Sequence, residues 1–281
     1  MSNLLGAAEI RELAALLDLK PTKKLGQNFV VDANTCRKIV KLADVSKSDV
    51  ALEIGPGLGS LTLALLEASK AVIAIEIDQR LAKQLPATVA KHGFAAENLQ
   101  VINQDAMQVS NLPTLNPLPT VLVANLPYNV SVPVLLNLLE HFPSIKCGVV
   151  MVQSEVAERL VAKANNKEYG SPTVKSNWWA DLTWAGPVSR SVFWPVPNVD
   201  SALVRFDRHP PLGSEELRIK TFKVIDHAFA KRRKMMRSAI SELFGGSAPA
   251  EQALISAGID PTIRGEALTV QQFSQIAQQI S

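Results

Sequence analysis

The sequence contains few of the residues that build metal centres or disulfide frameworks. Its 281 residues include two cysteines, Cys36 and Cys147, which lie far apart in apolar surroundings without a CxxC or Cys/His cluster. The four histidines show no spacing typical of metal ligands. We therefore expect buried thiols, no bound metal and no disulfide.

Long apolar runs are also missing. No stretch approaches the roughly 18 consecutive apolar residues that a membrane-spanning helix needs. Residues 1–24 lack the order of positive charge, apolar run and small-residue cleavage site that marks a secretory signal. We therefore expect a cytoplasmic protein without a membrane partner, and we expect it to be monomeric.

Strong charge of one sign is absent from the chain as a whole. The formal net charge is +3, and a whole-chain average of this size does not by itself indicate a nucleic-acid partner. Hydrophobic residues make up 47% of the sequence. A chain of this length and composition can bury one full-sized core and has room for a smaller second domain.

Between residues 50 and 153, short β-branched apolar runs alternate with stretches of helical periodicity. This alternation predicts parallel strands joined by crossover helices. Two later strand-like runs, at 181–188 and 201–207, indicate an antiparallel edge. The predicted parallel strands, nearly unbroken in apolar residues as doubly buried strands are, cover 50–55, 71–77, 99–105, 120–126 and 147–153.

Helical periodicity fills the segments between these strands. Asp32 is expected to cap one of the helices, and Pro86 and Pro133 leave the ends of two others open. The predicted helices cover 7–19, 33–43, 60–69, 79–92, 130–142 and 154–164.

The pattern changes at residues 208–214, where prolines, Gly213 and Ser214 are typical of a linker. Beyond this point only helices are predicted, over 214–244, 249–259 and 269–280. The sequence thus predicts an α/β domain with an N-terminal helical extension over residues 1–208 and a small all-helical domain over residues 209–281.

A glycine-rich stretch, EIGPGLGS, follows the first predicted strand and opens a helix. Gly55 and Gly57 permit a tight turn whose backbone approaches a ligand closely. A dinucleotide fingerprint would place its third glycine at Ser60, so the loop is instead a G-x-G-x-G turn preceded by Glu53. This form is used by enzymes that bind S-adenosylmethionine (AdoMet). Glu76 ends the second strand, where an acid can accept both hydroxyls of a ribose.

Asp105 follows the third predicted strand in the sequence NQDAM. At the carboxyl end of a sheet it could accept a hydrogen bond from an exocyclic amino group such as that of adenine, while the Ala106 N–H meets a ring nitrogen. The alternative is an ordinary helix cap or solvated acid.

The tetrapeptide Asn125-Leu126-Pro127-Tyr128 ends the fourth strand and matches the N/D-x-P-Y signature of enzymes that methylate an exocyclic amino nitrogen. The Asn125 side-chain oxygen and a carbonyl near Leu126 or Pro127 can accept the two amino hydrogens and aim the nitrogen. Pro127 stiffens the turn. Tyr128 offers a ring face for a base that has left its helix. The structural alternative is an ordinary βα turn with Tyr128 packed on the sheet.

Nine motifs in order and spacing resemble the ribosomal small-subunit RNA adenine dimethyltransferases. They are LGQNFVVD, EIGPGLGSLT, IEID, QDAM, NLPYNVSVPV, KEYGSPTV, FWPVPNVDSALVRF, AFAKRRKMMR and GIDPTIRGEALTV. The resemblance implies a Rossmann-like class I AdoMet methyltransferase fold. It also implies transfer of two methyls to N6 of each of two adjacent adenosines, in the 3′-terminal hairpin loop of 16S rRNA, during small-subunit biogenesis.

The resemblance also implies roles for individual residues. Those implied to hold AdoMet are Gln27, Asn28 and Val30 at the methionine, Gly55, Gly57, Glu76 and Ile77 at the backbone and ribose, Asp105 and Ala106 at the adenine, and Asn125. The implied acceptor pocket consists of Asn125, Leu126, Pro127 and Tyr128, with Phe193 stacking on the target base. A core aromatic at a strand edge is the alternative for Phe193.

Basic residues gather in the sequence KRRKMMR, where a helix is predicted to let them reach phosphates while Met235 and Met236 pack inward. A solvated face is the alternative. Trp178 and Trp179 could be stacking platforms or core residues. The predicted RNA-binding residues are Lys23, Lys24, Lys231, Arg232, Arg233, Lys234 and Arg237, with Lys20, Arg208 and Arg218 adding to a basic rim.

Other functions stay open at this point. A same-fold N6-adenine methyltransferase could act on large-subunit rRNA, and a same-fold enzyme could act on a small-molecule amine, although the basic C-terminal helices argue against the latter. A third alternative is an assembly factor in which RNA binding outweighs catalysis. A NAD dehydrogenase is disfavoured by Ser60 and by the lack of a catalytic His/Lys pair.

Overall fold

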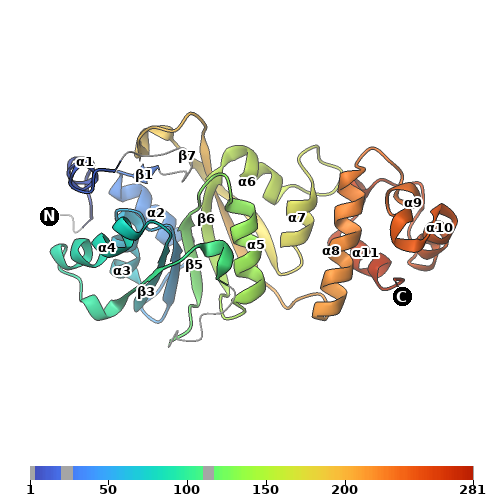
Figure 1. Cartoon of the computed structure of the whole chain (residues 1–281), viewed down its shortest axis with the longest axis horizontal. Helices are drawn as coiled ribbons and strands as arrows, with labels where there is room; N and C mark the ends of the chain where they lie inside the picture. The colour runs from blue at the N-terminus through green and yellow to red at the C-terminus, as the bar shows by residue number, and fades with distance from the viewer. Residues whose placement is uncertain (1–3, 20–27, 110–116, 281) are drawn as a thin grey trace. The chain divides into compact units, whose positions relative to one another are not determined.

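The computed structural model describes residues 4–19, 28–109 and 117–280 (Figure 1). The chain divides into two compact units, one of residues 1–157 and 183–208 and the other of residues 158–182 and 209–281. Residues 158–182, which we predicted in the first domain, group with the helical unit. The prediction that residues 1–208 carry the methyltransferase function and residues 209–281 bind RNA stays a prediction.

A seven-stranded sheet forms the core of the first unit, in the order β4-β3-β2-β5-β6-β9-β7. The first five of these strands run parallel, and β9 runs antiparallel to β6. The predicted mostly parallel sheet with an antiparallel edge is therefore confirmed. The strands are β2 (Val50–Ile54), β3 (Ala71–Glu76), β4 (Leu99–Asn103), β5 (Val121–Asn125), β6 (Cys147–Gln153), β7 (Ala180–Val188) and β9 (Ser201–Arg208).

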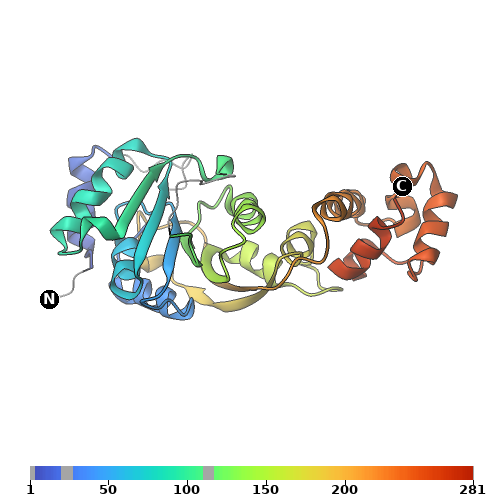
Figure 2. The same ribbon diagram turned by 90° about the horizontal axis from the view of Figure 1, so that it is seen from below.

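Helices cover both faces of this sheet (Figure 2). Asp32 caps α2 as predicted, because its carboxylate accepts the Thr35 N–H at 2.8 Å. Pro86 lies within α4, whereas Pro133 falls in the first turn of α5, where the missing N–H costs no helical bond. The helices of the α/β region are α1 (Ala7–Leu16), α2 (Ala33–Leu42), α3 (Ser60–Ala68), α4 (Gln79–Lys91), α5 (Ser131–His141) and α6 (Ser154–Val161).

Two short strands, β1 (Phe29–Val30) and β8 (Phe193–Trp194), form a separate antiparallel ribbon. The Val31 N–H extends this pairing by donating to Val192 O at 2.7 Å. The Phe29 and Trp194 rings stack with their centroids 6.3 Å apart. The ribbon therefore joins a segment near the N-terminus to one that precedes β9.

The second unit consists mainly of helices, with α8 packed against both α7 and α11. Its core holds Trp178 and Trp179, whose rings meet the edge of Phe222. Both tryptophans are buried, so they are core residues rather than stacking platforms. The helices of this region are α7 (Ser171–Ser176), α8 (Glu215–Ala230), α9 (Met236–Ala239), α10 (Ser247–Ser256) and α11 (Val270–Ala277).

The prediction of one continuous helix over 214–244 is wrong, because α8 ends at Ala230 and the α-helix resumes only in α9. Residues 231–234 form a turn that the Lys234 N–H closes onto Lys231 O at 2.8 Å. The Met236 and Arg237 N–H groups then donate to the carbonyls of Ile263 and Pro261. These tertiary bonds replace the helical ones, and periodicity alone does not reveal them.

No helix within the described residues is long and apolar enough to span a bilayer. Cys36 and Cys147 are both free thiols. Cys36 is buried, and burial raises its pKa to about 12, whereas Cys147 is only partly buried.

Candidate active site

A cavity of about 230 Å³ opens where the parallel strands of the first unit end. Its walls come from the segments that follow β2, β3, β4 and β5, together with residues 28–30. Since β2 lies between β3 and β5, the chain leaves this edge of the sheet in two directions, which creates a crevice there. The predicted cofactor residues that line the cavity are Asn28, Val30, Gly55, Gly57, Glu76, Ile77, Asp105, Ala106 and Asn125.

The glycine turn adopts a backbone that other residues rarely adopt. Gly55 and Gly57 have φ values of +66° and +59°. A Cβ at Gly57 would lie 2.9 Å from the Phe29 ring, so the turn needs glycine for both conformation and space. Phe29 itself lines the cavity, which the sequence analysis missed.

Glu76 lies buried at the end of β3 with both carboxylate oxygens bonded to the backbone. One oxygen accepts the Gly57 N–H at 3.1 Å and the other accepts the Asp78 N–H at 2.9 Å. Burial raises the pKa of Glu76, and these two N–H groups lower it in part. The carboxylate is thereby tied to the glycine turn.

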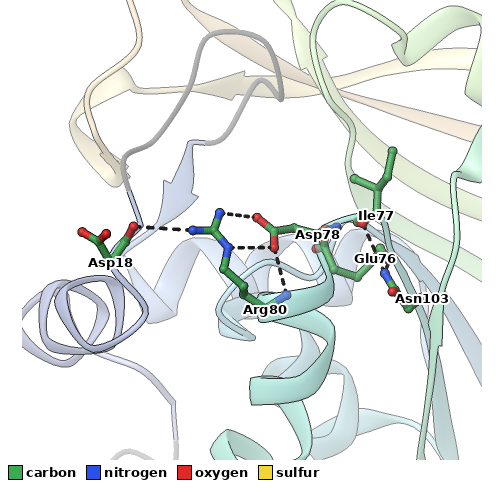
Figure 3. Close-up of polar contacts among 6 residues, drawn as sticks. All are labelled: Asp18, Glu76, Ile77, Asp78, Arg80 and Asn103. Atoms are coloured by element: carbon green, nitrogen blue, oxygen red, sulfur yellow. Dashed lines mark hydrogen bonds and ion pairs between the residues drawn. The ribbon is translucent and has the colours of Figure 1, made fainter.

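A second layer of polar contacts holds the chain around Glu76 (Figure 3). The Asn103 side-chain N–H donates to the carbonyls of Glu76 and Ile77. The Asp78 carboxylate pairs with the Arg80 guanidinium at 2.7 Å and also accepts the Arg80 N–H, which caps α4. These contacts fix the turn that presents Glu76 to the cavity.

Glu53 is a second buried carboxyl in the same cavity, 1% exposed. Within the part of the chain that the structure describes, its Oε2 has no partner at hydrogen-bond geometry. Burial raises the pKa of Glu53 to about 8; the Thr62 hydroxyl lowers this pKa in part, and the nearby Glu76 carboxylate raises it further. In the sequence, Glu53 stands beside the glycine turn without a signal for its role.

Asp105 both lines the cavity and caps the short 3₁₀ helix Ala106–Gln108, where it accepts the Met107 N–H at 2.9 Å. Both sequence interpretations of Asp105 are therefore compatible with its position. The Asn137 side chain donates to the carbonyls of Ala106 and Val109 and so anchors this segment to α5.

Asn125 ends β5 at the cavity, and its side-chain N–H donates to Asn28 O at 3.1 Å. This bond leaves Oδ1 as the acceptor atom of the amide. Pro127 also lines the cavity, whereas Leu126 is buried and donates its N–H to Met151 O. Tyr128 is partly buried, with its hydroxyl 2.6 Å from that of Ser201.

Three described residues of the predicted acceptor pocket, Leu126, Tyr128 and Phe193, do not line the cavity. Phe193 is 2% exposed and packs in the core beside β1, so the ring has no free face in this structure. Its stacking on a base stays a prediction, and its buried position is compatible with the alternative of a core aromatic. Gln27, Lys23, Lys24 and Lys20 lie outside the described residues.

Three of the five basic residues in KRRKMMR form ion pairs inside the second unit. Lys231 pairs with Glu242, Arg232 with Glu266 and Arg237 with Glu251, at distances between 2.7 and 3.1 Å.

Arg233 and Lys234 are exposed in the turn after α8. Met235 is 44% exposed rather than packed inward, and it pairs through its backbone with Arg264, another exposed cation. Only Met236 packs inward as predicted. The sequence analysis did not assign Arg264, since it lies far from the charge run.

Arg208 and Arg218 do not form a basic rim. Arg218 is 9% exposed, pairs with Glu215 and lies over the rings of Trp179 and Phe222. Arg208 donates to Leu139 O and is half-buried. Among the described residues there is no group of three or more His, Cys, Asp or Glu arranged to hold a metal ion.

The strand order, the glycine turn after β2 and the acid at the end of β3 define a Rossmann-like class I methyltransferase fold. Two solved structures agree with this assignment. A dimethyladenosine transferase from Plasmodium falciparum matches with a TM-score of 0.74 and 25% identity, over 88% of this chain and 95% of that one. The 23S rRNA methyltransferase ErmE matches with a TM-score of 0.65 and 25% identity, over 90% and 99%.

Sequence relatives are more similar still. A protein from Streptomyces griseus subsp. griseus named ribosomal RNA small subunit methyltransferase A is 56% identical over 98% of this chain and 94% of its own. One of the same name from Kineococcus radiotolerans is 54% identical over 99% and 92%. The family model for ribosomal RNA adenine dimethylase matches residues 19–281. The chain belongs to the ribosomal RNA adenine dimethylase family, which confirms the resemblance found in the sequence.

Proposed function

We propose that this protein uses AdoMet to dimethylate N6 of two adjacent adenosines in the 3′-terminal hairpin loop of 16S rRNA, during small-subunit biogenesis in the cytoplasm. The observation that carries the proposal is the position of Asn125. Its amide lies at the edge of the cavity that Gly55, Gly57 and Glu76 line, so one crevice can hold a methyl donor and an amino acceptor together.

The cavity residues fit AdoMet in shape and charge. Glycine leaves room where a Cβ would fill the turn, and Glu76 can accept ribose hydroxyls through the remaining lone pairs of its oxygens. Glu53 Oε2, which accepts no hydrogen bond from the described residues, offers a buried acceptor toward a positively charged ligand. When bound, AdoMet supplies a methyl group activated by its sulfonium.

The protein must then orient a weak nucleophile, since the lone pair of an adenine amino nitrogen is delocalised into the ring. Asn125 Oδ1 can accept one amino hydrogen, because the amide nitrogen is held by Asn28 O. This bond aims the nitrogen and favours its passage toward sp³ geometry. No general base is needed at Asn125, since the proton can leave after methyl transfer.

The RNA side of the proposal rests on the exposed cations of the second unit. Arg233, Lys234 and Arg264 are exposed near Met235 and suit phosphate contacts that fix the RNA backbone. The small subunit is favoured over the large one by the relatives, which at 54 to 56% identity are named for the small subunit, whereas the 23S enzyme is 25% identical.

The test is incubation of the protein with AdoMet and small subunits from cells that lack this methylation, followed by mass mapping of the RNA. We expect N6,N6-dimethyladenosine at two adjacent positions of the 3′ hairpin loop. Methylation of large-subunit RNA alone would contradict the choice of target. RNA binding without methylation would favour the assembly-factor alternative.

A further inference from the structure

The Tyr128 hydroxyl has a defined partner that the sequence did not suggest. Tyr128 Oη lies 2.6 Å from Ser201 Oγ, across a separation of 73 residues in the chain. Ser201 is fully buried, and burial raises the pKa of the Tyr128 hydroxyl. A buried hydroxyl without a partner costs free energy, so this bond sets where the end of the ring can lie.

Ser201 is held rigidly by the sheet. It is the first residue of β9 and lies opposite Gln153, the last residue of β6. The Ser154 N–H donates to Asp200 O at 2.9 Å and extends this pairing by one bond. The Ser201 hydroxyl therefore has a fixed place at the carboxyl end of β6, next to β5 and its acceptor turn.

The backbone of Tyr128 is fixed as well. The preceding Leu126 N–H bonds to Met151 O at 3.1 Å, and the Val130 N–H closes a turn onto Pro127 O at 3.2 Å. A tyrosine side chain has two soft torsions between its backbone and its hydroxyl. With both ends held, the plane of the ring is set before any base arrives.

We propose that Ser201 is a positioning residue, which fixes the Tyr128 ring in the plane that holds the target adenine during two successive methyl transfers. This inference rests on the proposed function. The second transfer is the more demanding one, because the nitrogen then carries a methyl group that must turn away from the donor. A loosely held ring should therefore slow the second transfer more than the first.

The test compares Ser201→Ala and Tyr128→Phe, each of which removes one hydroxyl of the pair, with the double variant. Single-turnover rates and the ratio of monomethyl to dimethyl adenosine are measured on unmethylated small subunits. We expect each single variant to slow the second transfer about three- to tenfold and to accumulate monomethyladenosine. The double variant should be no slower than either, because both changes remove the same bond.

Ser69→Ala is the matched control. Ser69 is also a buried serine of the first unit, but its hydroxyl donates to Leu65 O at the end of α3, away from the acceptor turn. This control should lose similar thermal stability while keeping the wild-type product ratio. Ser201→Thr keeps a hydroxyl. The folded Ser201→Thr variant should therefore form more dimethyladenosine than Ser201→Ala.

Three outcomes would overturn the inference. One is a wild-type product ratio in Ser201→Ala and Tyr128→Phe. Another is a double variant whose rate of second transfer falls by the product of the two single reductions. The third is a slower second transfer in Ser201→Ala that is explained entirely by weaker binding of AdoMet or RNA. If the wild-type protein itself forms no methyladenosine, the proposed function fails instead, so the two failures are distinguishable.

Discussion

The cavity of the first unit and the basic turn of the second, residues 231–234, differ in how well a short sequence pattern predicts them. EIGPGLGS, IEID, QDAM and NLPY each lie at the carboxyl end of a strand, and the structure brings residues of all four together around one cavity. KRRKMMR was predicted to lie in one helix with its cations reaching RNA, but residues 231–234 form a turn, α9 begins at Met236, and three of the five cations are in ion pairs. Residues that fix backbone geometry therefore predict where a site forms. A run of charged residues does not predict which of its side chains are exposed to a ligand.

The largest expected effect is at Asn125. Asn125→Ala removes the acceptor for the amino group and also the bond to Asn28 O. We expect the methyl-transfer rate to fall by about a hundred- to a thousandfold, as for other single groups that stabilise a transition state. RNA affinity, measured by filter binding, should stay within about twofold of the wild type. A comparable loss of RNA affinity would show that the cavity and the RNA surface are not separate.

The buried acid Glu53 should make the cavity sensitive to pH. Burial raises its pKa in the folded protein to about 8, above the ordinary 4.5 of a glutamate side chain, so the folded state favours the protonated form. The stability this gives is fully present below about pH 4.5 and is lost as pH rises through about 8. Glu53→Gln should remove this dependence and gain on the order of a few kcal/mol over the wild type by pH 9.

The same acid predicts the pH dependence of donor binding. A cationic donor in the cavity favours the Glu53 carboxylate, so binding should release a proton below about pH 8 and tighten as pH rises. Calorimetry in buffers of different ionisation enthalpy measures this release. The Glu53→Gln variant should show none, and an unchanged proton release in that variant would contradict the assignment.

A matched pair of glycine substitutions, one in the glycine turn and one after α4, tests the role of the turn. Gly57 and Gly93 both have positive φ, of +59° and +80°, but only at Gly57 would a Cβ meet a neighbour, the Phe29 ring at 2.9 Å. Gly57→Ala should weaken AdoMet binding about tenfold or more, because it combines strain with a displaced cavity wall. Gly93→Ala should cost stability alone and leave the affinity unchanged. Equal affinities in the two variants would show that the turn does not border the donor.

The smallest effect is expected in the basic turn. The prediction compares its exposed cations, Arg233 and Lys234, with the cations that form ion pairs. Replacing Arg233 and Lys234 by alanine should weaken RNA binding and reduce its salt dependence by about 0.7 to 0.9 per residue on a log–log plot. Replacing Lys231 and Arg237 should change this slope little, because Glu242 and Glu251 already pair with them. Equal slopes for the two double variants would contradict the distinction.

The strands, their parallel order, the cap at Asp32 and the cavity could be predicted because each leaves a local signal. Buried parallel strands read as apolar runs, and the glycine turn is required by its backbone. For Phe193 a local signal could not decide between a core position and an exposed one, and it could not predict the end of α8 or the bond between Tyr128 and Ser201. Each depends on a partner distant in sequence: the β1 ribbon, the carbonyls of residues 261–263 and the start of β9.

The central claim is that Asn125 presents the amino acceptor to a donor bound in the cavity of the first unit. A crystal structure with S-adenosylhomocysteine and an adenosine nucleotide tests this most directly. We predict that the thioether lies between Gly55 and Asn125, with the adenine amino group on Asn125 Oδ1 and the ring against Tyr128. A donor bound outside this cavity, or an adenine held away from Asn125, would contradict the account.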